Sequence, residues 1–70
     1  MSFEEFRKMR EKIQAAKDSI FALEEEISNN NLLKFTEAER AEWRKQFYSL
    51  RVQLGYTGSS LLNNIGDADD

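Results

Sequence analysis

Residues 37–54 read EAERAEWRKQFYSLRVQL, and apolar side chains recur in this stretch on two opposite sides of a helix. At about 100° per residue, one narrow stripe contains Trp43, Phe47, Leu50 and Leu54. The opposite stripe contains Ala38, Ala41, Tyr48, Val52 and Tyr56. One neighbouring helix covers one stripe, so the second stripe predicts contact with a further surface, either another copy of the chain or a different protein.

Residues 3–28 carry a second helical pattern. Ser2 and Glu5 are spaced as the N-cap and the third helical residue of a capping box, which marks a helix start. Apolar residues then recur in alternating steps of three and four, as in a heptad repeat: Phe6, Met9, Ile13, Ala16, Ile20, Leu23 and Ile27. Phe3 and Phe21 widen this stripe, which favours a globular bundle over a two-stranded coiled coil.

An apolar connection separates the two helical segments. Asparagines fill positions 29–31 and predict the end of the first helix, because asparagine tolerates the left-handed conformation that closes helices. Three large apolar residues follow: Leu32, Leu33 and Phe35. They either plug the end of the bundle or form an extra helical turn.

The second helix is bounded by recognisable signals. Thr36 and Glu39 form another capping box, and Gly55 predicts that the helix ends at about Leu54. Beyond it, residues 59–65 predict a short third helix. Residues 67–70 read DADD, which predicts a solvated acidic tail.

These segments predict an all-α fold for residues 1–66, a single domain in which helices 3–28 and 37–54 form an antiparallel hairpin with a short C-terminal helix. A turn near Leu32 places Ile13 opposite Leu54, and the stripe that contains Trp43 and Leu50 then forms the seam with the first helix. We expect the uncovered apolar stripe to join copies of the hairpin into a four-helix bundle dimer or a higher oligomer.

Composition narrows the classes of function. The 70 residues include neither cysteine nor histidine and carry a net charge of −3. We therefore expect no metal site and no cofactor, and no group of side chains resembles a catalytic constellation, so we expect no enzyme activity. The acidic balance disfavours nucleic acid and membrane partners. Without an apolar run long enough to cross a bilayer or a secretory signal, a cytoplasmic protein is expected.

A row of arginines lines one flank of the second helix, between its apolar stripes: Arg40, Arg44 and Arg51. Guanidinium groups fit the carboxylates of an acidic protein or a phosphate group. The alternative is pairing within the chain. The expected register brings the glutamates at 24–26 near Arg40 and Arg44.

The segment Tyr56-Thr57-Gly58-Ser59-Ser60 resembles a ligand-binding loop. Hydroxyl groups and free backbone amides before a helix suit an anion such as phosphate. The spacing of a Walker motif is missing. The alternative interpretation is a helix C-cap followed by an N-cap, which needs the same residue types.

The sequence therefore predicts a non-enzymatic protein–protein interaction module that uses the arginine row together with Tyr48 and Val52. Small, acidic, cysteine-free chains are common among phage-encoded inhibitors and assembly factors, so we expect an inhibitor or adaptor of a partner protein. Two alternatives remain. One is an oligomer that sequesters a small phosphorylated ligand or nucleotide through residues 56–60, and the other is a structural subunit of a larger assembly.

Overall fold

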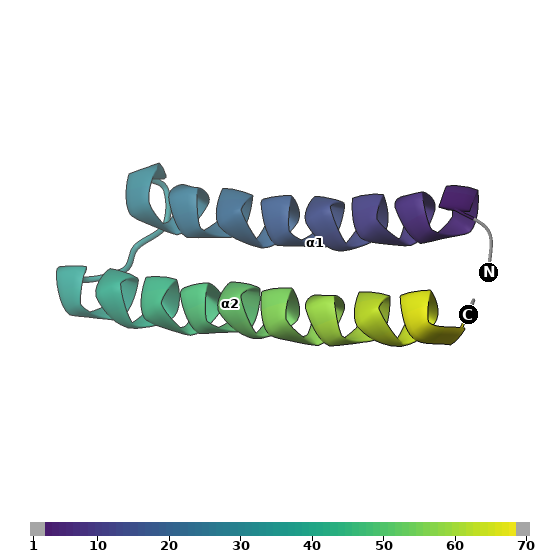
Figure 1. Ribbon diagram of the computed structural model, residues 1–70. Helices are drawn as coiled ribbons and strands as arrows, with labels where there is room; N and C mark the ends of the chain where they lie inside the picture. Colours follow the sequence, from purple (N-terminus) through teal and green to yellow (C-terminus); the bar gives the residue numbers. More distant parts are fainter. Residues whose placement is uncertain (1–2, 69–70) are drawn as a thin grey trace.

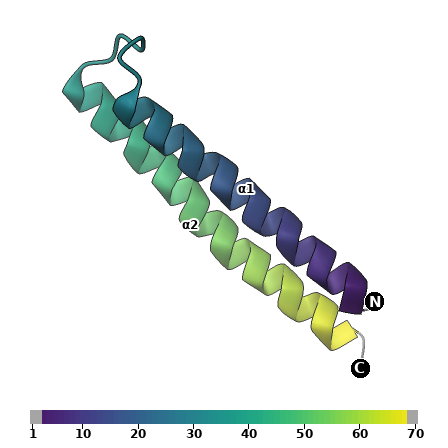
Figure 2. The same ribbon diagram turned by 90° about the horizontal axis from the view of Figure 1, so that it is seen from above.

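The computed structural model describes residues 3–68, which form helix α1 (Phe3–Asn29) and helix α2 (Glu37–Ala68). The two helices lie antiparallel and side by side along their whole length (Figure 1), and the view from above shows the same pairing (Figure 2). The all-α helical hairpin is therefore confirmed for the described part of the chain. No helix within residues 3–68 combines the length and the apolar character needed to cross a membrane.

Helix α1 ends with an Asx turn. The Asn30 amide donates to the Glu26 carbonyl oxygen at 2.9 Å, and the Asn30 side-chain oxygen accepts from the Leu32 amide at 2.9 Å. No described residue has a positive φ angle, so the expected left-handed asparagine is wrong. The Asn30 side chain reverses the chain by satisfying a backbone donor locally, and this needs no left-handed residue.

The apolar residues of the connection do not cover the end of the hairpin as expected. Leu32 and Phe35 are exposed, and only Leu33 of the three apolar residues is half-buried. The segment is not an extra helical turn either, because residues 30–36 form a hydrogen-bonded turn followed by irregular backbone. The proposed N-cap Ser2 lies outside the described residues.

Helix α2 begins at the predicted capping box. The Glu39 amide donates to the Thr36 hydroxyl at 3.1 Å, and the Glu39 carboxylate accepts from the Thr36 amide at 2.9 Å. The reciprocal bonds satisfy two donors that a bare helix end leaves without partners. The backbone bond from Thr36, followed by the bond to its side chain, lowers the pKa of Glu39 from its ordinary 4.5.

This lowered pKa predicts a pH dependence of stability. Because the pKa of Glu39 is lower in the folded chain than in the unfolded one, its contribution is fully present above pH 4.5 and is lost as the pH falls through the folded value. Glu39→Gln keeps an acceptor for the Thr36 amide but does not titrate. Thermal unfolding followed by circular dichroism should therefore show a larger fall in Tm between pH 7 and pH 3 for the native chain than for the variant. Equal losses would contradict the assignment.

Helix α2 continues where the sequence predicted a stop. The expected end at Leu54 and the separate helix at 59–65 are wrong, because α2 is continuous to Ala68. Gly55 and Gly58 lie inside it with ordinary negative φ angles. Each glycine costs about 1 kcal/mol relative to alanine in a helix interior, and packing of the downstream residues against α1 outweighs this cost.

The seam between the helices is narrow. Ile27, 8% exposed, is the buried apolar side chain among the described residues, and it is accompanied by half-buried residues of both helices: Phe6, Met9, Ile13, Ile20, Phe47, Leu54, Leu62 and Ile65. Gly58 is also buried, in contact with Ile13. Ile13 therefore lies opposite Gly58, about one turn beyond the expected Leu54, because a residue without a side chain lets the two helices approach closely.

The hairpin is a flat slab. Its Cα atoms extend over 52 × 17 × 9 Å, so it presents two broad faces on either side of the seam. Trp43 and Leu50, expected in the seam, are largely exposed at its edge. The residues that the seam leaves uncovered therefore determine what each broad face can bind.

Candidate functional site

One broad face is built around Arg51, and we call it the basic face. The Arg51 guanidinium lies 5.1 Å from the ring centres of both Phe21 on α1 and Tyr48 on α2. Such distances are typical of cation–π contacts. The basic face comprises these three residues together with Lys17, Val52, Tyr56 and Ser59.

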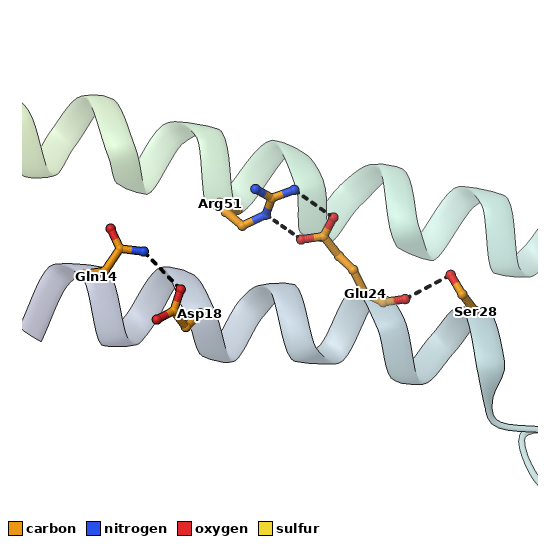
Figure 3. A network of polar contacts seen from close by, with 5 residues as sticks. All are labelled: Gln14, Asp18, Glu24, Ser28 and Arg51. Carbon is orange, nitrogen blue, oxygen red and sulfur yellow. Dashed lines mark hydrogen bonds and ion pairs between the residues drawn. The ribbon is translucent and has the colours of Figure 1, made fainter.

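Arg51 also joins the two helices through a charged pair. Figure 3 shows Arg51 reaching from α2 to Glu24 on α1, where Nε and one terminal nitrogen donate to the two carboxylate oxygens at 2.7 and 3.2 Å. The side chains are 26% and 12% exposed. The hydrogen bond with Glu24 raises the pKa of Arg51 against the opposing effect of desolvation. This bidentate, partly buried geometry fixes the register of the helices more firmly than a single-point ion pair would.

Arg40 has a different structural task. Its guanidinium donates to the carbonyl oxygens of Ile27 and Asn30, and to that of Leu33 at 2.6 Å. The last carbonyl groups of a helix have no partner within the helix. Arg40 therefore closes the end of α1 and holds the connection against the start of α2.

The three arginines of the predicted row therefore make different contacts and do not form one binding surface. Arg44 is exposed, and its Nε donates to the Arg40 carbonyl oxygen at 3.4 Å. The alternative of pairing within the chain applies to Arg51 and Glu24, whereas the sequence placed these pairs at Arg40 and Arg44. The difference follows from the register, which brings Glu24 opposite Arg51.

A groove of about 360 Å³ lies on the basic face, lined by Lys17, Arg51, Val52, Gly55, Tyr56 and Ser59. The Lys17 ammonium lies beside Gly55, at 4.0 Å from the position that a Cβ there would occupy, which is an ordinary van der Waals distance. Lys17 is half-buried. Sequence reasoning missed both Lys17 and Gly55 because their contact depends on the interhelical register. The four-residue spacing of Lys17 and Phe21, which places them on one side of α1, was an available signal.

The segment 56–60 does not form a ligand loop. Its backbone is helical, so the free amides expected there are wrong. Tyr56 and Ser59 nevertheless line the groove. Gly58 is buried in the seam, and Thr57 accepts a hydrogen bond from the Gln53 side chain at 3.3 Å, whereas Ser60 is exposed.

The opposite broad face also carries exposed apolar side chains. At about 100° per residue, Trp43, Leu50 and Leu61 fall on the flank of α2 away from Tyr48 and Val52, and Leu23 falls on the flank of α1 away from Phe21. These residues define the apolar face: Leu23, Trp43, Leu50 and Leu61. Each is 42–56% exposed, with Leu23 on α1 and the other three on α2.

Within residues 3–68, no three acidic side chains converge in a way that would hold a metal ion. Comparisons of the chain with protein-family models, with curated proteins and with solved structures gave no match. The inferences about function therefore depend on the two broad faces.

Proposed function

We propose that this chain is a non-enzymatic interaction module that associates with a second copy of itself through the apolar face. The observation that supports this proposal is the exposure of four large apolar side chains, which helical periodicity places on one side of the hairpin. Contiguous exposed apolar patches on small proteins are characteristic of interaction sites. A four-helix bundle dimer would cover them, with this face in place of the stripe containing Tyr48 and Val52 that the sequence predicted to join the copies.

The size of the face suits a second copy. A face of 52 × 17 Å corresponds to roughly 900 Å², close to the area of about 800 Å² that each partner contributes to a stable interface. A two-fold axis through the face brings the same apolar patch of each copy together, as in most homodimers.

The hairpin also has a small core of its own. Ile27 is the single buried apolar side chain among the described residues, and chains of this length supply only a few kcal/mol of stability from one core. Covering the apolar face of two copies at once would extend the seam of each hairpin into a shared core. Association therefore supports the fold as well as the function.

The association is tested by measuring mass in solution at tens of micromolar. We expect sedimentation to give a dimer for the native chain and a dissociation constant about a hundredfold weaker for Leu50→Glu, because a charge would be buried without a partner. The control is Val52→Glu, which places the same charge on the basic face of the same helix. A native monomer would contradict the proposal, and so would dissociation by Val52→Glu with no effect of Leu50→Glu.

An inhibitor or adaptor role towards a different protein remains a prediction from the sequence. Its surface would be the part of the hairpin that a dimer leaves open, which includes Arg44 and Tyr48. A dimer would present two such surfaces, and a partner that binds both at once would gain affinity by avidity. Leu50→Glu, which separates the copies, should therefore weaken binding of that partner as strongly as Arg44→Glu does. Binding assays with any partner should therefore include both variants.

A further inference from the structure

We propose that the groove on the basic face binds a small phosphate ester that carries an aromatic ring, as in a nucleoside monophosphate. The proposal does not depend on self-association, because the lining residues lie on the face opposite Leu50. Four features of the lining support it: the Lys17 ammonium, the remaining donors of Arg51, the Ser59 hydroxyl and the exposed Tyr56 ring.

The first observation is an unpaired cation. Lys17 is half-buried, yet within residues 3–68 no carboxylate forms an ion pair with it. The ammonium lies beside Gly55, at 4.0 Å from the position of a Cβ there, and lines the groove together with Arg51. An anion in the groove would supply the absent counter-charge.

The second observation is the remaining capacity of Arg51. A guanidinium has five N–H donors, and Glu24 takes two of them through Nε and one terminal nitrogen. The Glu24 carboxylate neutralises the charge of Arg51, so the net positive charge beside the groove is that of Lys17. Lys17 and the free donors of Arg51 line the same groove and together suit the several acceptor oxygens of a phosphate.

The third and fourth observations concern Ser59 and Tyr56. Ser59 adds an exposed hydroxyl donor at four residues from Gly55, on the same side of α2. Tyr56 presents an exposed ring at the groove, where it is accessible to a planar ligand. The groove volume of about 360 Å³ lies in the range of small-molecule sites.

The test is calorimetric titration of the full chain with three probes: adenosine monophosphate, adenosine and inorganic phosphate. We expect the monophosphate to bind at least about tenfold more tightly than either fragment, because it engages both the cations and the ring. Lys17→Met should weaken binding of the monophosphate by about tenfold, because it removes a contact to the phosphate. Tyr56→Leu should also weaken binding of the monophosphate by about tenfold, because it removes stacking on the base. Lys45→Met, which removes a lysine outside the groove, is the matched control.

Several results would overturn the proposal. These are the absence of binding at millimolar monophosphate, equal affinity for inorganic phosphate, and equal weakening by Lys17→Met and Lys45→Met. Circular dichroism of each variant shows whether the hairpin still forms. If Lys17→Met does not fold, Lys17→Arg serves instead. It keeps the charge, so it should retain binding of the monophosphate, and its failure to bind would count against the site.

Discussion

Replacing Gly58 with leucine is expected to destabilise the hairpin by about 3 kcal/mol, because the seam has no room for a side chain at this position. A Cβ on Gly58 would lie 2.7 Å from Ile13 Cγ2 and 3.2 Å from Ile13 Cδ1. Ile13 cannot swing away cheaply, since a β-branched residue in a helix has one strongly preferred χ1 rotamer. Urea unfolding at a fixed protein concentration measures the change in the free energy of unfolding.

Alanine at the same position tests the same contact, because the sign of its effect on the free energy of unfolding depends on Ile13. Gly58→Ala gains about 1 kcal/mol of helix propensity but meets Ile13, so a net destabilisation is expected. In an Ile13→Ala background the obstacle is gone, and Gly58→Ala should then stabilise the chain by about 1 kcal/mol. A double-mutant cycle isolates this coupling.

Gly55 is the matched control for Gly58. It lies one turn earlier in the same helix, and its added Cβ would meet only the flexible end of Lys17 at 4.0 Å. Gly55→Ala should therefore stabilise the hairpin by about 1 kcal/mol in every background. If Gly58→Ala stabilises the native chain as much as Gly55→Ala does, Ile13 does not pack on Gly58 and the register described here is wrong.

The same glycines explain why part of the fold was predictable from sequence and part was not. The capping box at Thr36 depends on residues three positions apart, and local chemistry alone identified it correctly. Gly55 carries an equally clear local signal for a helix end, yet α2 continues through it. The continued helix brings Gly58 against Ile13, forty-five residues away in sequence, and no local pattern contains that contact.

The candidate sites also combine features that the local sequence shows with features that depend on how the two helices pair. The second apolar stripe of residues 37–54 correctly indicated uncovered surface, but the seam of α2 is centred on Phe47, Leu54 and Gly58, so Trp43 and Leu50 lie at its edge. That register also decides which glutamate meets Arg51 and which glycine meets Lys17. Charge and residue type are visible in the sequence, whereas the pairing of two helices depends on all their contacts at once.

Arg40→Met is the other substitution expected to have a large effect, with a loss of about 2 kcal/mol in the free energy of unfolding. The methionine keeps most of the aliphatic volume but removes the donors to the carbonyl oxygens of Ile27, Asn30 and Leu33. A charge-assisted hydrogen bond contributes about 1.5–3 kcal/mol, and renewed hydration of the carbonyl groups at this exposed turn offsets part of the sum.

Arg44→Met provides the comparison, because Arg44 is exposed and should change stability by less than about 0.5 kcal/mol. Hydrogen exchange adds a local readout. In Arg40→Met, the amide of Leu33, which donates to the Asn30 carbonyl oxygen at 3.2 Å, should lose protection, whereas amides in the middle of α1 should follow only the global change. Equal stability of the two variants would mean that Arg40 does not hold the connection, and that the Asx turn at Asn30 suffices to join the helices.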